Sequence, residues 1–169
     1  MANYDLAILG GGPGGYVAAI RGAQRGLKTC IIEKDKLGGI CLNWGCIPTK
    51  ALLKNAEVYN TIKNADKYGI KVDKISVDFP ANIKRSRDVS NRLSKGIEFL
   101  MKNNKITHIH GMGKLTSKTT IETTSSKKKE KVNAEKIIIA TGARPRSFPG
   151  MEFDGKRVIS SKEAMVLDI

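Results

Sequence analysis

The sequence predicts an α/β fold in which helices flank a parallel sheet, and two observations near its start carry that prediction. A short apolar run over residues 4–9 ends in the glycine-rich turn GGGPGG. A helical pattern over residues 16–27 then leads into a second apolar run over residues 28–34. Strand, turn, helix and strand in this order form a βαβ unit, whose two strands are parallel and are joined by a right-handed crossover.

Two longer helices are expected after this unit. Apolar residues recur at helical spacing from Pro48 to about Lys67, and again from about Pro80 to Asn103. Pro48 is favoured in a first helical turn because it has no N–H group to leave unpaired, and it pushes Ile47 away from helical angles. The first of these helices is therefore expected to begin close to Pro48.

The pattern changes to a period of two after Asn104, which is typical of strands. Residues 105–117 and 119–126 alternate in this way, and the sequence IIIA follows at 137–140. We interpret these segments as a small antiparallel sheet that ends in a buried strand, Ile137 to Ala140. A Pro/Gly boundary near residue 150 then precedes a weak helical pattern.

Composition places the chain among ordinary globular proteins, with 40% hydrophobic and 27% charged residues. No apolar run approaches the ~18 residues that a membrane span needs. The N-terminus lacks the basic, apolar and small-residue regions of a signal peptide. We therefore expect a cytoplasmic protein without a membrane partner, in a reducing compartment where cysteine pairs are more often catalytic or metal-binding than structural.

The net charge of +14 raises the question of nucleic acid binding. The lysines are scattered along the chain, apart from the basic run at residues 127–131. Aromatic residues make up 5% of the chain and none interleaves with that run, so no stacking platform for bases is visible. We interpret the run as a solvated loop and expect no nucleic acid partner.

The glycine turn has the spacing of a dinucleotide-binding motif. Gly10, Gly12 and Gly15 fit the pattern G-x-G-x-x-G between a strand and a helix, as in a Rossmann-like fold. The first glycine permits the tight turn, the second lets the backbone approach a pyrophosphate, and the third allows close packing of helix and strand. Glu33 ends the second strand, where an acidic side chain can accept both ribose hydroxyls. The motif by itself does not separate FAD from NAD.

The segment LGGICLNWGCIPTK places Cys41 and Cys46 five positions apart. A zinc site is not expected, because no second pair of ligands exists and His108 and His110 lack further partners. A structural disulfide closing so short a loop would constrain little of the unfolded chain. A redox couple is the better interpretation, and no metal is predicted.

Helix geometry sets a condition on such a couple. In an ideal helix the two Cα atoms would lie roughly 8.6 Å apart, whereas a disulfide tolerates at most about 7 Å. If the two cysteines bond, Cys41 must therefore precede the regular helix, and we expect it on an irregular segment, available for exchange with an outside disulfide. Cys46, beside the helix N-terminus, is placed where the helix dipole favours a thiolate. Cys30 lies in a buried-strand pattern and is expected to be an inert core residue.

These segments resemble a known family. GGGPGGYVAAIRGAQRGLKTCIIEK, LGGICLNWGCIPTKALL and IIIATGARP are similar to the three N-terminal signatures of the dihydrolipoamide dehydrogenases, a branch of the flavin-dependent pyridine nucleotide–disulfide oxidoreductases. The resemblance spans residues 4 to about 165. It implies FAD as the bound dinucleotide, with Cys41 as the interchange cysteine, Cys46 as the charge-transfer cysteine and Lys50 near the reactive nitrogen of the flavin. A cation there would stabilise negative charge on the reducing ring.

The resemblance also assigns the contacts to FAD. The segment 38–41 would line the flavin, Gly113 would contact the adenine side, and residues 141–143 would form a second cofactor-contacting turn. Across the chain, the residues implied in cofactor binding are Gly10, Gly12, Pro13, Gly14, Gly15, Glu33, Lys34, Gly38, Gly39, Ile40, Cys41, Cys46, Lys50, Gly113, Thr141, Gly142 and Ala143. Residues 1–149 are then an FAD-binding domain, and residues 150–169 are a connector toward an NAD-binding domain.

The implied reaction oxidises dihydrolipoamide with NAD⁺, which is a co-substrate, in a homodimer that serves the lipoyl groups of a 2-oxoacid dehydrogenase complex. The chain departs from the family in length, and we expect it to be an N-terminal portion that is inactive alone. Trp44 stands where many relatives carry a smaller apolar residue, which would alter the packing beside the cysteine pair. Two alternatives stay open: a member of the same family acting on glutathione or mercuric ion, and a non-catalytic nucleotide-binding module.

Overall fold

The computed structural model describes residues 2–125 and 129–167. The chain divides into two compact units: the first comprises Met1–Cys41 and Arg92–Arg144, and the second comprises Leu42–Asn91 and Pro145–Ile169. The predicted division at residue 149 stays a prediction. Of the basic run predicted to be a solvated loop, Lys127 and Lys128 lie outside the described residues. The loop prediction is wrong for residues 129–131, which begin the strand β6 (Lys129–Ile139).

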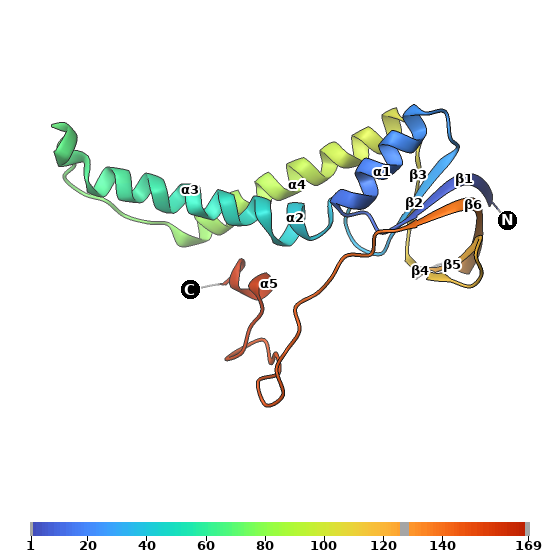
Figure 1. Ribbon diagram of the computed structural model, residues 1–169. Coiled ribbons are helices and arrows are strands. Elements are labelled where there is room, and N and C mark those ends of the chain that lie inside the picture. Colours follow the sequence, from blue (N-terminus) through green and yellow to red (C-terminus); the bar gives the residue numbers. More distant parts are fainter. Residues whose placement is uncertain (1, 126–128, 168–169) are drawn as a thin grey trace. The chain divides into compact units, whose positions relative to one another are not determined.

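A six-stranded sheet organises the first unit, in the spatial order β3-β2-β1-β6-β5-β4. Its parallel part consists of β3 (Thr107–His110), β2 (Thr29–Glu33), β1 (Ala2–Leu9) and the second half of β6 (Lys129–Ile139). Its antiparallel part consists of the first half of β6, β5 (Thr120–Thr124) and β4 (Met112–Leu115). Figure 1 shows the long β6 running between these two parts. The predicted α/β fold with a parallel sheet and an antiparallel meander is confirmed.

The expectation of one strand over residues 105–117 is wrong. The chain turns at Gly111, so that His110 pairs with Glu33 in the parallel part while Met112 pairs with Thr124 in the antiparallel part. Both strands alternate with a period of two, and that period carries no information about which neighbour a strand pairs with. The alternating pattern of the sequence therefore continues from β3 into β4, although these two strands pair with different neighbours.

The expectation of a buried strand from Ile137 to Ala140 is also wrong. Ile137 is half-buried and packs against the core, but Ile138 and Ile139 are 40% and 62% exposed. Among the described strands this part of β6 pairs only with β1. Successive side chains of a strand point to opposite faces, so hydrogen bonding to a neighbour does not bury both faces. An unbroken apolar run was therefore no measure of burial here.

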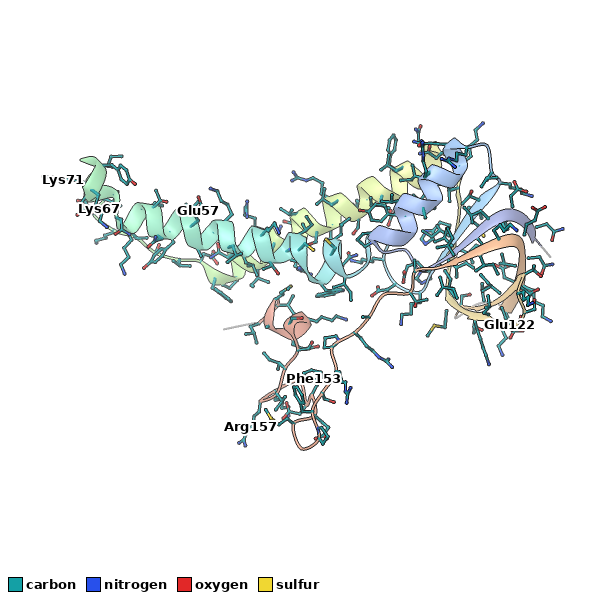
Figure 2. The ribbon with its side chains drawn as sticks, viewed as in Figure 1. Glu57, Lys67, Lys71, Glu122, Phe153 and Arg157 are labelled. Carbon is teal, nitrogen blue, oxygen red and sulfur yellow. The ribbon has the colours of Figure 1, made fainter. Side chains whose placement is uncertain are left out.

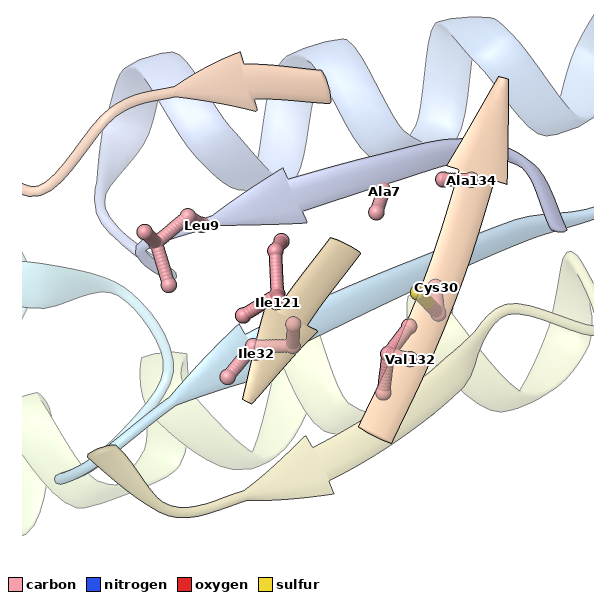
Figure 3. Packing of buried hydrophobic residues seen from close by; sticks show 7 residues of the cluster. All are labelled: Ala7, Leu9, Cys30, Ile32, Ile121, Val132 and Ala134. Carbon is pink, nitrogen blue, oxygen red and sulfur yellow. The ribbon is translucent and has the colours of Figure 1, made fainter. Parts of the chain in front are cut away.

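The main core lies between the parallel strands and the meander. Ala7, Leu9, Cys30 and Ile32 come from β1 and β2 and meet Ile121, Val132 and Ala134 from β5 and β6, as Figure 3 shows. The opposite face of β1 meets helix α1 (Pro13–Gln24), where a Cβ on Gly15 would collide with the carbonyl group of Gly10. This close approach brings the start of α1 directly onto the end of β1.

The helical prediction is confirmed with two changes. The expected helix from Pro48 is α3 (Cys46–Lys63), which begins two residues earlier and is followed by the short helix η1 (Ala65–Tyr68). The second expected helix is α4 (Phe79–Asn103). The weak helical pattern after residue 150 corresponds to the short helix α5 (Ser161–Ala164), whereas the short helix α2 (Gly39–Trp44) was not predicted.

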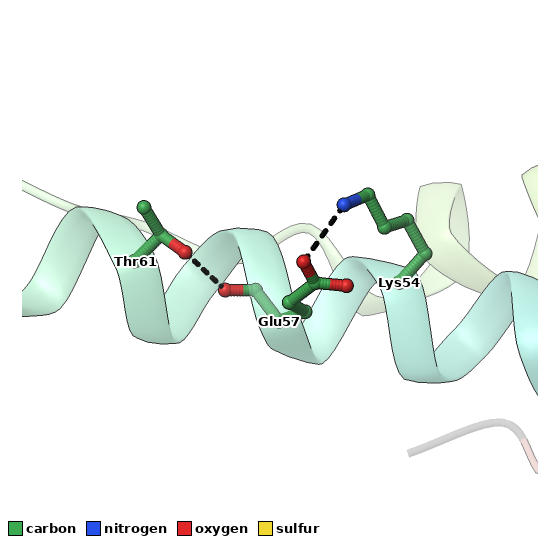
Figure 4. A network of polar contacts seen from close by, with 3 residues as sticks. All are labelled: Lys54, Glu57 and Thr61. Carbon is green, nitrogen blue, oxygen red and sulfur yellow. Dashed lines mark hydrogen bonds and ion pairs between the residues drawn. The ribbon is translucent and has the colours of Figure 1, made fainter.

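Helix α3 carries a group of polar contacts on its exposed surface. Lys54 forms an ion pair with Glu57 at 2.9 Å, and the Thr61 hydroxyl donates to the Glu57 carbonyl, also at 2.9 Å (Figure 4). The labelled side chains of Lys67 and Lys71 follow at the far end of this segment in Figure 2, both exposed. Exposed pairs of this kind contribute about 0.3–0.5 kcal/mol each.

Across residues 2–125 and 129–167, none of the helices combines the length and apolar character that a membrane span requires.

Candidate functional site

The turn between β1 and α1 presents bare backbone at the carboxyl end of the parallel strands. Gly10 has φ +110° and its N–H group donates to the Ile32 carbonyl at 2.8 Å. Gly12 caps α1 in an extended conformation, and neither a side-chain cap nor an acidic residue occupies the first turn. Unpaired N–H groups at such a helix N-terminus favour a phosphate, and ligands of open α/β sheets bind at this edge.

Glu33 is tied to this turn by its own carboxylate. Oε2 accepts a hydrogen bond from the Gly11 N–H at 2.7 Å, and Oε1 accepts one from the Asp35 N–H at 2.8 Å. A carboxylate has about four lone-pair sites, so each oxygen keeps a site for a further donor. The side chain is half-buried at the end of β2, which leaves it accessible to a ligand. A pair of ribose hydroxyls matches this acceptor pair.

A second pair of glycines, Gly38 and Gly39, packs against the turn. The Gly38 N–H donates to the Gly11 carbonyl at 2.8 Å, and Gly39 has φ +59°. A Cβ on Gly39 would lie 2.5 Å from the Gly12 Cα, whereas a Cβ on Gly12 would meet nothing nearer than the Gly39 Cα at 3.8 Å. Gly39 is therefore required for packing. Gly12 leaves open space on the side where a phosphate would stand.

A cavity of about 80 Å³ adjoins the turn. It brings together five residues that the sequence singled out, namely Gly10, Glu33, Lys34, Gly113 and Thr141. Its other lining residues, which sequence reasoning missed, are Leu9, Ile32, Gly111 and Met112.

The cavity depends on a glycine in β4. A Cβ on Gly113 would approach the side chains of Leu9, Ile32 and Ile121, so β4 lies close over the ends of β1 and β2 only because that side chain is absent. Met112, the neighbour of Gly113, is 56% exposed and lines the cavity. Its position between two glycines of a predicted strand was the one sequence signal that could have identified it.

The turn predicted to make a second contact with the cofactor follows β6. The Ala140 N–H donates to the Leu9 carbonyl at 2.8 Å, which carries the chain past the glycine turn. Thr141 lines the cavity, whereas Gly142 and Ala143 are exposed beyond it. Pro13 and Gly14 are exposed in the first turn of α1.

The cysteine segment differs in one respect from its prediction. Cys41 lies within the short helix α2 rather than on an irregular segment, and α2 meets the longer α3 at Gly45, which has φ −148° and ψ −113°. Cys41 nevertheless precedes α3, as a bond to Cys46 requires. The Cys46 thiol is free in the structure, so the disulfide stays a prediction.

Cys46 and Lys50 share one face of α3. Cys46 is the first residue of that helix, Lys50 follows four positions later, and both are exposed. Residues four apart are neighbours on a helix surface, so the two side chains start from adjacent positions on that face. Ile40, which precedes Cys41, is 49% exposed and belongs to the first unit with the glycine turn.

Cys30 is a core residue, as predicted. Its side chain is fully buried in the core cluster between the parallel strands and the meander, and burial raises the pKa of its thiol to about 12. A thiol that stays protonated at neutral pH is neither a nucleophile nor a metal ligand. Within residues 2–125 and 129–167, no group of three or more His, Cys, Asp or Glu side chains is placed to hold a metal ion.

Known proteins share these features over nearly the whole chain. The chain is 48% identical to a dihydrolipoyl dehydrogenase of Chlorobaculum parvum over 98% of its length, and 44% identical to one of Bacillus subtilis over 98%. It is 45% identical to a mitochondrial dihydrolipoyl dehydrogenase of Schizosaccharomyces pombe, again over 98%. It spans only 36%, 37% and 33% of these three relatives.

A family model reaches equally far along the chain. The model described as pyridine nucleotide-disulphide oxidoreductase matches residues 4–168. That match includes the glycine turn, Glu33, both cysteines of the α2–α3 segment and the turn after β6. The chain therefore belongs to the pyridine nucleotide-disulphide oxidoreductase family.

Proposed function

We propose that this chain is the FAD-binding and redox-cysteine portion of a dihydrolipoyl dehydrogenase. The observation that carries the proposal is the construction of the glycine turn. Gly10 and Gly12 present an uncapped helix N-terminus, and Glu33, fixed to Gly11, faces the adjoining cavity. These features supply a phosphate site and a ribose site at one edge of the sheet. The similarity to curated dihydrolipoyl dehydrogenases supports the choice of FAD and of the reaction.

The residues present fit that cofactor. The N-terminal turn of α1 would hold the pyrophosphate, Glu33 would accept from the ribose hydroxyls, and the cavity beside Gly113 would receive the adenine end. Gly38, Gly39 and Ile40 would line the flavin side. Bound FAD supplies two-electron redox chemistry, and the protein supplies position and electrostatics.

The cysteines perform the exchange with the substrate. One thiolate of dihydrolipoamide attacks Cys41 Sγ of the Cys41–Cys46 disulfide, which breaks that bond and releases Cys46 as a thiolate. The second substrate thiolate then attacks the mixed disulfide, closing lipoamide and releasing Cys41. Cys46 is left at the N-terminus of α3, where the helix dipole and the neighbouring Lys50 favour its negative charge.

The whole protein is proposed to pass these electrons to NAD⁺, to act on lipoyl groups of a 2-oxoacid dehydrogenase complex, to form a homodimer and to work in the cytoplasm. The similarity to curated dihydrolipoyl dehydrogenases supports the reaction, and the remaining statements are carried by the resemblance to the family described above. The chain itself covers about a third of the length of those relatives.

The test is anaerobic reduction of the FAD-reconstituted chain by dihydrolipoamide. We expect one equivalent to release two titratable protein thiols and to produce a long-wavelength thiolate-to-flavin absorption band. Cys41→Ser should keep a thiolate at Cys46 and therefore the band, whereas Cys46→Ser should lose it. Reduction by glutathione but not by dihydrolipoamide would contradict the proposed substrate. A band that survives in Cys46→Ser would show that the two roles are reversed.

A further inference from the structure

The α2–α3 segment that carries Cys46 is anchored by three consecutive residues of α4. Arg85 Nη1 donates to the Ala51 carbonyl at 3.1 Å, and the buried Ser86 hydroxyl donates to the Pro48 carbonyl at 3.3 Å. Arg87 Nη1 donates to the Asn43 carbonyl at 2.7 Å. Hydrogen bonds from charged donors are about twice as strong as neutral ones. Arg85 and Arg87 are therefore the stronger donors, and Arg87 makes the shorter bond, to the anchored carbonyl that lies nearest the N-terminus of the segment.

Arg87 also stacks on Trp44, the single tryptophan of the chain. The guanidinium carbon lies 4.8 Å from the indole centroid. The Lys162 ammonium nitrogen, from α5, lies 4.6 Å from the same centroid. These two are the charged side chains that contact the ring, and each such contact contributes about 0.5–1 kcal/mol or more when desolvated.

Among the described residues, only Nη1 of the three guanidinium nitrogens makes a hydrogen bond. Nε and Nη2 are buried, and among the described residues they have no hydrogen-bond partner. Burial lowers the pKa of Arg87. The guanidinium group of Arg87 thus lies against the Trp44 ring rather than against a carboxylate, although burial disfavours its charged form. The contact with the Trp44 ring is therefore the specific interaction of this group, and a planar guanidinium can stack on an aromatic face in a way that an ammonium group cannot.

We propose that Arg87 is a positioning residue for Cys46, acting through the Asn43 carbonyl and the Trp44 ring. Asn43 and Trp44 end α2, Gly45 forms the break, and Cys46 begins α3. Gly45 has no side chain to fix that break, so the anchored residues before it set the direction in which α3 starts. The redox role of Cys46 in this inference rests on the proposed function.

Alkylation of Cys46 tests the proposal without any cofactor. All variants carry Cys41→Ser, and Cys30 is fully buried, so iodoacetamide reports on Cys46 alone. Arg87→Gln should lower the alkylation rate at pH 7 by about twofold to fivefold and move its pH profile upward, the range expected when a thiolate loses a helix N-terminus. Trp44→Leu should give the same loss, and Trp44→Phe should restore most of the rate.

Two more variants separate position from charge. Arg87→Lys keeps the cation but loses the planar stack, so we expect at least half of the Arg87→Gln effect. Lys84→Gln removes an exposed charge three residues away, in an ion pair with Asp88 at 2.6 Å, and should leave the rate unchanged. The fluorescence of Trp44 should shift in both Arg87 variants and not in Lys84→Gln. Circular dichroism checks that each variant is folded. If Arg87→Gln does not fold, the alkylation rates of Arg87→Lys, Trp44→Leu and Trp44→Phe test the proposal instead.

Equal rates in Arg87→Lys, Trp44→Leu and Lys84→Gln would overturn the positioning role, even if the chain binds FAD. Failure to bind FAD with the Arg87 and Trp44 effects intact would instead contradict the proposed function. In that case the effect of Arg87 and Trp44 on the reactivity of the Cys46 thiol would still hold.

Discussion

The Gly11 N–H group donates a hydrogen bond to Glu33 Oε2 at 2.7 Å across the end of the parallel sheet. This single contact joins the turn after β1 to the last residue of β2. The Glu33 carboxylate, proposed to bind the ribose, and the backbone turn proposed to bind the phosphates are therefore joined by a hydrogen bond. A change at Glu33 should act on binding and on the turn together.

Glu33→Gln keeps the size of the side chain and removes its charge. We expect FAD affinity to fall by about tenfold to a hundredfold, because hydrogen bonds to a charged acceptor contribute about 1.5–3 kcal/mol. Isothermal titration of the purified chain with FAD measures this change. Glu57→Gln is the matched control, because Glu57 is exposed on α3 in a weak ion pair with Lys54. Unchanged FAD affinity in Glu33→Gln would remove the ribose role.

Gly12 and Gly39 face each other but should respond differently to alanine. Gly12→Ala meets no atom closer than 3.8 Å and has a φ of −74°, so the free energy of unfolding should change by under about 1 kcal/mol. FAD affinity should nevertheless fall, since the new methyl group would stand where the backbone approaches the pyrophosphate.

Gly39→Ala should do the reverse and destabilise the fold itself. Its φ of +59° costs an L-residue about 1–2 kcal/mol, and the new Cβ would lie 2.5 Å from the Gly12 Cα. Urea unfolding of both variants, beside FAD titration, separates the two effects. Equal destabilisation by the two substitutions would show that the open side of Gly12 is packing space.

Cys30 should make stability fall at alkaline pH. The pKa of its thiol is about 12 in the folded state against an ordinary value of 9.0, so its contribution to stability is complete below pH 9 and is lost as pH rises through 12. At pH 10 the loss should be on the order of 1 kcal/mol. Cys30→Ala should flatten this part of the stability profile, and Cys46→Ala, at an exposed position, should not. Identical slopes in the wild type and Cys30→Ala would contradict the burial of this thiol.

The exposed end of β6 gives a test of the observed packing. Ile139 is 62% exposed and Ile31 is fully buried. Ile139→Thr should change the free energy of unfolding by no more than about 0.5 kcal/mol, as surface substitutions do, whereas Ile31→Thr should cost about 2 kcal/mol or more. Urea unfolding measures both. A large loss in Ile139→Thr would mean that this isoleucine is covered.

The local features of this fold were predictable because they depend on neighbouring residues. The βαβ unit follows from two apolar runs around a glycine turn, and the helices α3 and α4 follow from apolar spacing. The partners of strands are decided over long distances, so the switch at Gly111, which sends β3 to β2 and β4 to β5, left no local trace.

The candidate site divides in the same way. Gly10, Gly12 and Glu33 were identifiable because their chemistry is tied to a fixed spacing. Met112 and the anchors Arg85 and Arg87 were not, because they reach the site only through tertiary packing. Cys41 was expected on an irregular segment and lies in α2, because six residues ending at Trp44 are too few to show a helical period.

The most direct test of the central claim is titration of the purified chain with FAD, with FMN as the comparison. The glycine turn and Glu33 are proposed to bind the pyrophosphate and the adenosine ribose, which FMN lacks. We predict one FAD per chain, a yellow protein, and binding at least tenfold tighter than that of FMN. Absence of FAD binding, or equal affinity for FAD and FMN, would contradict the proposed function of this site.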